Sequence, residues 1–544
     1  MRRIAALLIL VMVSLSNHGC SKGGGTSGTG APANGGTLRV ALWAEPTSLN
    51  PLLATNTAEN FVSSLAFDLL VTIDDKGNEV PDLAAVVPTP ENGGISKDGR
   101  TITYHLRRNV TWQDGAPFTS ADVKFSWQAV MSPNNNVVER RGYDQVKSVD
   151  TPDPYTVVFH LKTPFAPFVD TVFGESDDPF RIVPKHILAK YPNINQVPFN
   201  QLPIGTGPFK ITRWIHGDRI ELAANPKYFR GAPKLKAITV LIVPDGNTQE
   251  SELRAHDVDL VPDIGTANLN NLRARPAPGV TTLLAKGPSY FAIDYNTKHP
   301  PLDDVRVRRA LNYAIDEKRI IDTLLYGTAV PAAADLSDFY WAYEPNVMRY
   351  PYDLEKAKSL LDSAGWTVGS GGVREKNGQR LTLELTYGQG NATARQMGVQ
   401  IQQDLRKAGV DLQIKTYNYT LLYATKAMGG ILNSGKYDLA EYAWISGADP
   451  DDSSGWMCDM VPPAGNNITQ YCNPQFDAAQ RDALAHFDRA RRKKDYSITQ
   501  KLLASDAPAA FQYYQRRRYA LSTNLHDFTP NGISEGWNAY TWSL

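Results

Sequence analysis

The sequence lacks an excess of charge of either sign and contains little cysteine or histidine. Among its 544 residues, Lys and Arg number 56 and Asp and Glu also number 56, so the formal net charge is zero. Nucleic acid and anionic membrane surfaces bind proteins that carry a basic field, so neither is predicted as the main partner. The 9 histidines include no His-x-His or His-x-x-x-His pair, and the 3 cysteines form no zinc knuckle. We therefore predict no metal site and no cofactor.

Long apolar runs are also missing, apart from one near the N-terminus. That run, residues 4–15, is shorter than the ~20 residues that a permanent bilayer-spanning helix needs. Two arginines precede it and Gly-Cys follows, so residues 1–20 have the pattern of a secretory signal peptide. The end of this segment resembles a bacterial lipobox, with Asn17 where the pattern has an aliphatic residue. We expect lipidation of Cys20, a flexible Gly/Ser-rich tether over 21–36, and an exported protein that is lipid-anchored in the periplasm or at the cell surface.

The scarcity of cysteine has a further consequence. If Cys20 carries lipid, only Cys458 and Cys472 remain. In an exported chain, a single remaining pair most simply forms one disulfide. The alternative is two free, buried thiols.

Two lobes are expected, because a chain of this length is too long for one hydrophobic core. Strand–helix–strand patterns occur in two distant places, at 237–261 and 381–414. A later strand-like segment, 511–521, follows the helices of the second lobe and is placed to return the chain to the first. The hinge would then have two crossings, near Pro288 and Gln515. The predicted boundaries are 37–287 for the first lobe, 288–514 for the second and 515–544 for the return.

Signals for catalysis are weak. Residues 532–536, Gly-Ile-Ser-Glu-Gly, match a nucleophile elbow, but such an elbow needs a histidine after the serine and none follows Ser534. The three aspartates at 449, 451 and 452 could suggest calcium, yet the residues that complete a calcium loop are absent. We therefore predict that the protein is not an enzyme, with a secreted hydrolase as the rival hypothesis.

The segment 442–457 has the composition of a ligand-gripping loop. Aromatic residues lead into a turn-rich run with three carboxylates, and another tryptophan follows. Trp444 and Trp456 can each offer a flat apolar face and one N–H donor. The clustered basic residues at 489–494 are surrounded by Asp482, Asp488 and Asp495, which predicts a solvated helix face.

Several motifs, spread over nearly all of the predicted mature chain, resemble those of one family. The longest is LRRNVTWQDGAPFTSADVKFS at 106–126, and shorter ones stand at 205–209, 225–229, 304–311 and 352–366. They are similar to motifs of the family 5 bacterial extracellular solute-binding proteins, which are peptide, oligopeptide and nickel receptors of ABC importers.

The resemblance implies an α/β, two-lobed periplasmic-binding-protein fold of type II. It belongs to the large cluster, with an extra subdomain in the first lobe, at about 81–204. Ligand is enclosed between lobes that close about the hinge. The implied function is capture of small peptides for an ABC permease by a monomer. An oligosaccharide receptor of the same family is the alternative.

The resemblance also implies ligand-binding residues. Peptide-binding relatives carry Trp-x-x-Asp, in which the aspartate pairs with the ligand's α-amino group. Trp444 matches the tryptophan, but Gly447 stands in place of the aspartate. Either Asp449 holds the amine, or it caps a turn and the ligand lacks an amine there. The remaining expected contacts are aromatic walls and first-lobe residues: Trp456, Tyr290, Glu45 and Thr47.

Overall fold

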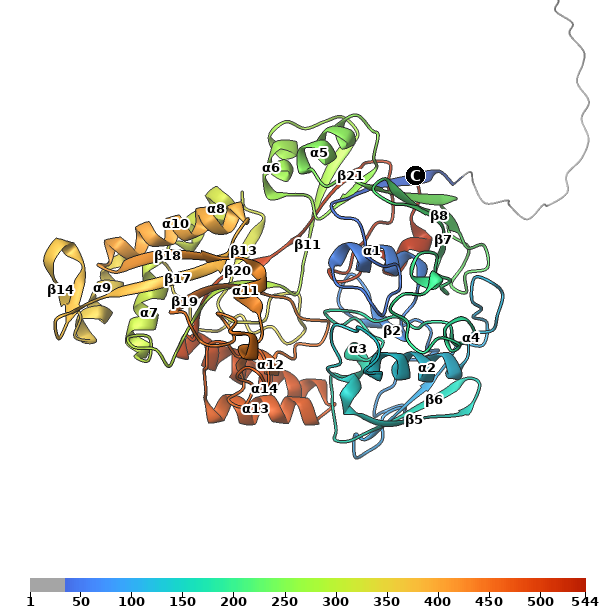
Figure 1. Cartoon of the computed structure of the whole chain (residues 1–544), viewed down its shortest axis with the longest axis horizontal. Coiled ribbons are helices and arrows are strands. Elements are labelled where there is room, and N and C mark those ends of the chain that lie inside the picture. The colour runs from blue at the N-terminus through green and yellow to red at the C-terminus, as the bar shows by residue number, and fades with distance from the viewer. Residues whose placement is uncertain (1–34) are drawn as a thin grey trace, which may run out of the picture.

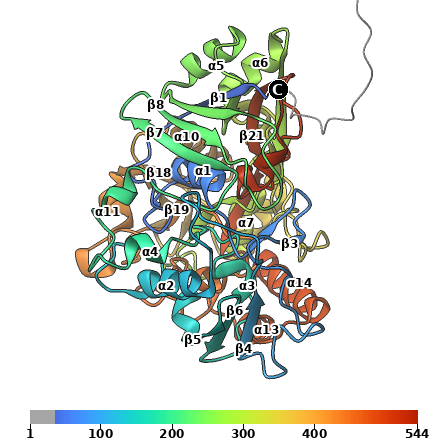
Figure 2. The ribbon, with the colours of Figure 1, turned by 90° about the vertical axis from the view of Figure 1, so that its right-hand side faces the viewer.

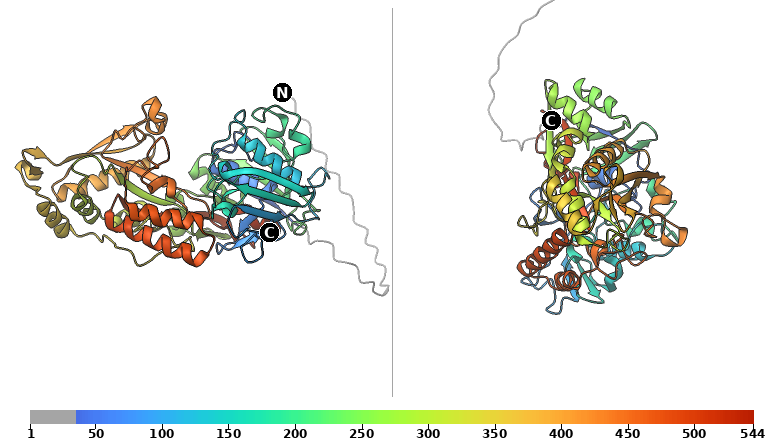
Figure 3. Two further views of the ribbon diagram at one scale, coloured as in Figure 1. Left: turned by 90° about the horizontal axis from the view of Figure 1, so that it is seen from below. Right: turned by 90° about the vertical axis from the view of Figure 1, so that its left-hand side faces the viewer.

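A computed structural model describes residues 35–544, which form two lobes side by side (Figures 1 and 3). The expected signal peptide, the lipidation site Cys20 and most of the tether lie outside the described residues. In the part of the chain that is described, no helix combines the length and apolar character needed to cross a membrane.

The first lobe is built on a seven-stranded mixed sheet. Strand β1 (Thr37–Leu42) lies between β9 (Ala237–Ile242) and β10 (Leu260–Pro262) and is parallel to both, so the two strands of the strand–helix–strand pattern at 237–261 flank β1 and do not pair with each other. The C-terminal strand β21 is inserted between β10 and β11 and is antiparallel to both. In spatial order the strands are β11 (Val280–Ala285), β21 (Arg517–Ser522), β10 (Leu260–Pro262), β1 (Thr37–Leu42), β9 (Ala237–Ile242), β8 (Arg219–Ala224) and β7 (Phe209–Ile215).

A smaller sheet in the same lobe lies within the segment predicted as the extra subdomain. It consists of β4 (Thr101–His105), β6 (Thr156–Leu161) and β5 (Val146–Asp153), and it lies below the main sheet in Figure 2. Trp112 is 1% exposed and belongs to a hydrophobic core that this sheet shares with the rest of the lobe. The lobe also contains the short pair β2 (Val71–Ile73) and β3 (Glu79–Pro81), and the helices α1 (Thr57–Ala66), α2 (Ser120–Met131), α3 (Phe168–Thr171), α4 (Lys185–Leu188), α5 (Gly246–Arg254) and α6 (Thr266–Ala274).

The second lobe is built on a six-stranded sheet. Strands β17 and β18 are parallel and are joined by α10, as the alternation of apolar residues predicted. The order is β13 (Ala329–Pro331), β20 (Ala509–Gln515), β12 (Tyr290–Tyr295), β19 (Leu439–Trp444), β17 (Thr382–Gly388) and β18 (Asp411–Tyr417), with β14 (Thr367–Val368), β15 (Arg374–Lys376) and β16 (Gln379–Arg380) in a separate ribbon. The helices are α7 (Val305–Ala314), α8 (Glu317–Leu324), α9 (Leu354–Ser363), α10 (Ala392–Lys407), α11 (Tyr419–Tyr423), α12 (Ser453–Trp456), α13 (Pro474–Ala485) and α14 (Arg489–Asp506).

Two chain segments connect the lobes, and they run beside each other. One leads from β11 into β12 and the other from β20 into β21. They are joined where the Gln515 backbone N–H donates to the Ser289 carbonyl at 3.1 Å. Two adjacent connections of this kind permit a hinge motion while they keep the lobes in register.

Candidate functional site

The lobes meet where the loop after β19 approaches the first lobe. The Ala448 backbone N–H donates to the Glu175 carbonyl at 2.7 Å. A Cβ atom on Gly447 would stand 2.7 Å from Ser176 Cα and 2.8 Å from the Glu175 carbonyl oxygen. Such distances exclude a side chain unless the backbone moves. Gly447, where the resemblance led us to expect an aspartate, therefore has a packing role at the contact between the lobes.

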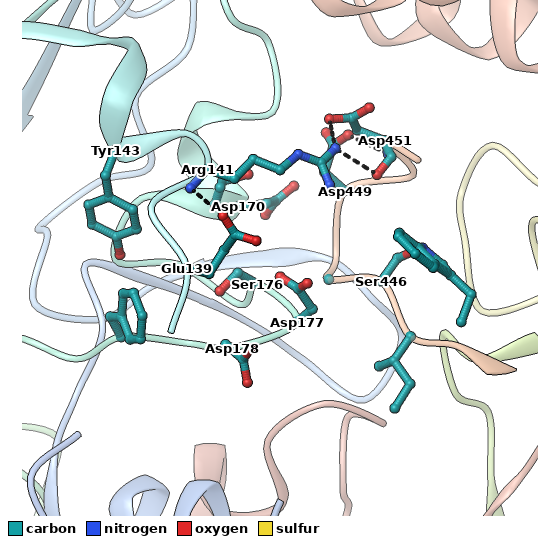
Figure 4. Close-up of a pocket in the computed structure, with 15 residues that line it drawn as sticks. Glu139, Arg141, Tyr143, Asp170, Ser176, Asp177, Asp178, Ser446, Asp449 and Asp451 are labelled. Carbon is teal, nitrogen blue, oxygen red and sulfur yellow. Dashed lines mark hydrogen bonds and ion pairs between the residues drawn. The ribbon is translucent and has the colours of Figure 1, made fainter. Parts of the chain in front are cut away.

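A pocket of about 40 Å³ opens beside this contact, with walls from both lobes (Figure 4). Trp444, Ile445, Ser446, Gly447, Asp449 and Asp451 line it from the second lobe, and Glu139, Arg141, Asp170, Ser176, Asp177 and Asp178 are among the first-lobe residues. A larger cavity of about 340 Å³ adjoins the pocket and shares Asp177, Asp178, Ile445 and Ser446 with it. Together they form a cleft between the lobes.

Asp449 is already paired within the second lobe. Both of its carboxylate oxygens accept from Arg492 Nη2 at 2.7 Å, and both side chains are buried. Burial raises the pKa of Asp449, and the charge of Arg492 offsets part of the rise. Arg492 also corrects the sequence interpretation of 489–494, because it is 6% exposed rather than part of a solvated face. A ligand amine would have to share Asp449 with this arginine.

Asp451 joins the two lobes by an ion pair. Its Oδ2 lies 2.5 Å from Arg141 Nη2 of the first lobe, and Gln480 Nε2 donates to its Oδ1 at 3.1 Å. Burial opposes ionisation of Asp451, but Arg141 and the hydrogen bonds from Ser453 outweigh it and lower the pKa of the carboxyl. Sequence reasoning missed Arg141, because nothing near it in the chain indicates a partner some 300 residues away.

The third aspartate of the loop has a different environment. Asp452 is 2% exposed and lies beside Asp335 in the interior of the second lobe. Burial, together with the neighbouring carboxylate, raises the pKa of Asp452 well above its usual range. Burial also raises the pKa of Asp335, so both neighbouring acids favour the protonated, neutral form, as expected when like charges cannot both ionise.

The aromatic side chains that were expected at the ligand differ in their surroundings. Trp444 is half-buried, lines the pocket and stacks on Tyr442 with ring centroids 5.9 Å apart. Trp456 and Tyr290, which were expected as walls, are 2% and 5% exposed and lie in a core cluster, where both pack on Phe511. These two side chains support the sheet behind the loop, and neither lines the two cavities of the cleft.

Glu45 and Thr47 are held in a network on the first lobe. Glu45 accepts from Trp214 Nε1 at 3.0 Å and lies 2.9 Å from His216 Nδ1. The backbone N–H and hydroxyl of Thr47 both donate to Glu59 Oε1, at 2.7 and 2.6 Å. Neither residue lines the pocket or the larger cavity, although the adjacent start of α1 lines the latter.

The structure contains the predicted disulfide between Cys458 and Cys472. It closes a loop that begins directly after the pocket-lining segment and α12. The bridge restricts this loop to fewer conformations, which fixes the base of the segment 444–452.

Ser534 lacks the surroundings of a nucleophile. Its Oγ donates to Glu175 Oε2 at 2.7 Å and accepts from Arg181 Nη2 at 2.9 Å, and the side chain is buried. A catalytic elbow requires a histidine base and an exposed serine. Its hydrogen bonds give Ser534 a structural role in the first lobe.

A family model described as "Bacterial extracellular solute-binding proteins, family 5 Middle" matches residues 78–462. The chain belongs to this family. Family 5 proteins share the type II periplasmic-binding-protein architecture, so the predicted fold class is confirmed.

The names of similar proteins state different ligands or none. The oligopeptide-binding protein AppA of Bacillus subtilis is 29% identical over 100% of this chain and 98% of its own. Its structure with a nonapeptide has a TM-score of 0.75 and 27% identity, and covers 94% of this chain and 100% of that one. Protein XP55 of Streptomyces lividans is 31% identical over 92% of this chain and 88% of its own. NikZ of Campylobacter jejuni, solved with Ni(L-His), has a TM-score of 0.75 and 28% identity, over 93% and 99%.

The nickel complex of the C. jejuni protein does not show that this chain binds a metal ion. Among residues 35–544, no group of three or more His, Cys, Asp and Glu side chains is placed to hold a metal ion. What the cleft offers instead is a set of carboxylates and the face of Trp444.

Proposed function

We propose that this family 5 protein captures peptides between its lobes and delivers them to the membrane subunits of an ABC importer. The observation that carries the proposal is the cleft at the lobe contact, which combines an aromatic face with carboxyl groups from both lobes. A peptide offers matching chemistry, with amines, amide groups and varied side chains. Support comes from the B. subtilis relative, which was solved with a nonapeptide on the same fold.

The mechanism we propose is binding coupled to closure of the lobes. The ligand contacts Trp444 and the segment 444–449 on one side and the first-lobe loop at 176–178 on the other. Its contacts with both lobes stabilise the closed state, because a ligand shifts an equilibrium only by its differential affinity for the two states. The closed form is then presented to the permease. The protein acts as a monomeric receptor without catalysis, and lipid on Cys20 holds it at a membrane.

Native mass spectrometry of the protein purified without denaturation tests the proposal directly. We expect co-purified peptides, and calorimetry with a peptide library is expected to show binding. The absence of binding by every peptide, with binding of oligosaccharides instead, would overturn it. For the lipid anchor, Cys20→Ala is expected to move the protein from the membrane fraction to the soluble fraction, and retention in the membrane fraction would contradict that part.

An oligosaccharide is the second candidate ligand, and one observation favours it. Trp444, Tyr442, Tyr423 and Tyr419 form a chain of ring contacts, with successive centroids 5.9–6.2 Å apart. Tyr419 and Tyr423 are exposed, and flat exposed rings suit sugar faces. Peptides with aromatic side chains use the same rings, so a direct comparison of the two ligand classes by calorimetry decides between them.

A further inference from the structure

The pocket at the lobe contact holds more carboxyl groups than the protein pairs with cations. Its lining includes six carboxylates and a single cation, Arg141. Arg141 pairs with Asp451, and Arg492 from behind the wall pairs with Asp449. The other four have no ion pair with any residue in 35–544: Glu139, Asp170, Asp177 and Asp178. All four come from the first lobe and face the same small space (Figure 4).

Asp170 is the most informative of the four. It lies on α3, is 8% exposed and lines the pocket. Its carboxylate has neither a hydrogen bond nor an ion pair with any described residue, although buried polar groups almost always have a partner. Burial, together with the nearby carboxylates of Glu79 and Asp449, raises the pKa of Asp170 well above its usual range. A buried carboxylate aimed at a cavity without a partner indicates that the partner comes from outside the chain.

We infer that this pocket is a subsite for the ammonium or guanidinium group of a lysine or arginine side chain on the bound peptide. Its volume of about 40 Å³ holds roughly three water-sized groups, which suits the charged end of such a side chain. The adjoining cavity of about 340 Å³ has room for a larger part of the ligand. Trp444 at the wall adds an aromatic face, which attracts a cation.

The inference rests on the proposed function and goes beyond it. An α-amino group is the cation that Asp449 was expected to hold, but Arg492 already occupies that carboxylate. The first-lobe carboxylates are a separate set, carried by α3 and by the loops at 139 and 177–178. They offer carboxyl groups without an ion pair among residues 35–544 to a cation that reaches in from the bound peptide, and such a cation would favour the ionised form of Asp170, whose pKa burial raises.

Titration calorimetry on the intact purified protein tests this subsite. The probes are two N-acetylated peptide amides that differ only in lysine or norleucine at one position, so neither has a free α-amine or carboxylate. We expect the lysine peptide to bind about 10- to 100-fold more tightly, the range of one or two charge-assisted hydrogen bonds. If both peptides bind equally, the inference is wrong and the proposed function stands. If no peptide of any kind binds, the proposed function itself fails.

Three variants sharpen the result. Asp170→Asn and Asp178→Asn are each expected to reduce the preference for lysine, while Asp322→Asn, on the exposed face of α8, is expected to preserve it. Asp170→Asn is also expected to raise the melting temperature of the ligand-free protein, because it removes an unpaired buried acid. A retained lysine preference in both Asp170→Asn and Asp178→Asn would overturn the assignment.

Two further ligands distinguish the source of the cation. Restoring a free α-amine to the norleucine peptide is expected to recover little of the lost affinity. Full recovery would make the pocket an amine-terminus site and overturn the inference. Free cadaverine is expected to bind far more weakly than the lysine peptide, since the peptide part also contributes. Equal affinity would make the ligand a small diamine and would likewise overturn it.

Discussion

The carboxylates that the two lobes bring to the cleft differ in one respect. The second lobe supplies Asp449 and Asp451, and each has an arginine partner within the protein. The first lobe supplies Glu139, Asp170, Asp177 and Asp178, and none has one among residues 35–544. Paired carboxylates hold the loop and the lobes in place, whereas the unpaired carboxyl groups have no partner within residues 35–544 and are available to a cationic ligand. Position in the same pocket therefore does not imply the same role.

The largest expected effect comes from breaking the Asp449 pair. Arg492→Met leaves a buried carboxylate without its partner, and loss of one member of a buried pair costs about 3–5 kcal/mol of stability. Urea denaturation of the second lobe measures the change. The double variant Asp449→Asn with Arg492→Met is expected to recover most of the loss. The exposed pair of Arg491 with Asp482 is the control, and Arg491→Ala is expected to cost less than about 1 kcal/mol. Equal losses for Arg491→Ala and Arg492→Met would show that burial does not make the Asp449 pair more important than an exposed pair.

Gly447→Ala is expected to weaken ligand binding rather than unfold either lobe. The added Cβ would press on the backbone at Ser176, and overpacking of this kind costs about 1–3 kcal/mol. Closure should therefore become less favourable, which predicts an affinity loss of about 5- to 100-fold. Calorimetry measures the affinity. Small-angle scattering should show that the liganded variant is larger than the liganded wild-type protein. Gly455→Ala is the matched control, since its Cβ would meet nothing within 4 Å. Normal binding by Gly447→Ala would show that the lobe contact is not needed.

The unpaired set also predicts a pH dependence. Burial and the carboxylates of Asp177, Glu139 and Glu59 raise the pKa of Asp178 to about 6. Below that pH the group is protonated and cannot attract a cation, so affinity for a lysine peptide should fall by about tenfold from pH 7 to pH 5. Calorimetry across this range measures the change, and Asp178→Asn should flatten it.

The stability of the ligand-free protein should depend on pH in the direction opposite to that of the ligand affinity. The folded protein holds the Asp178 proton more tightly than the unfolded chain, so this group's contribution falls as pH rises towards about 6. The comparison of wild type with Asp178→Asn isolates that contribution. A stability difference that grows in favour of the wild type as pH rises would contradict the assigned pKa.

Glu139→Gln is expected to have the smallest effect. Its carboxylate is exposed and accepts from the backbone N–H groups of Arg140 and Arg141, which already spread its charge. An exposed charge contributes about 0.2–1 kcal/mol, so we expect a loss of roughly two- to fivefold in affinity for the lysine peptide. An effect as large as that of Asp170→Asn would mean that burial does not rank the four acids.

Much of the fold could be predicted from local patterns, while the pocket could not. Alternating apolar residues located β17, α10 and β18, and the family motifs implied the architecture. Trp456 and Tyr290 were expected at the ligand because aromatic residues near a loop suit either a wall or a core. Only the long-range packing on Phe511 places them in the core.

The charged residues of the site show even more clearly that local sequence does not predict contacts between distant parts of the chain. Arg492 has aspartates close to it in sequence, which predicts a solvated helix, yet its partner Asp449 is 43 residues away. Asp170 stands on a four-residue helix with no motif around it. The run Glu-Ser-Asp-Asp at 175–178 was the one visible signal of an acidic wall, and its meaning depended on the opposite lobe.

The insertion of β21 between β10 and β11 has a consequence for how the chain reaches this state. A ribosome delivers the first lobe's other strands and then the entire second lobe before it delivers residues 517–522. Until then the first sheet has an open slot with unpaired backbone groups on both sides. The first lobe to be synthesised is thus the last to be completed, and its contacts have a large sequence separation, which slows folding. Deletion of β21 alone, residues 517–522, should therefore prevent folding of the N-terminal lobe and leave the C-terminal lobe able to fold.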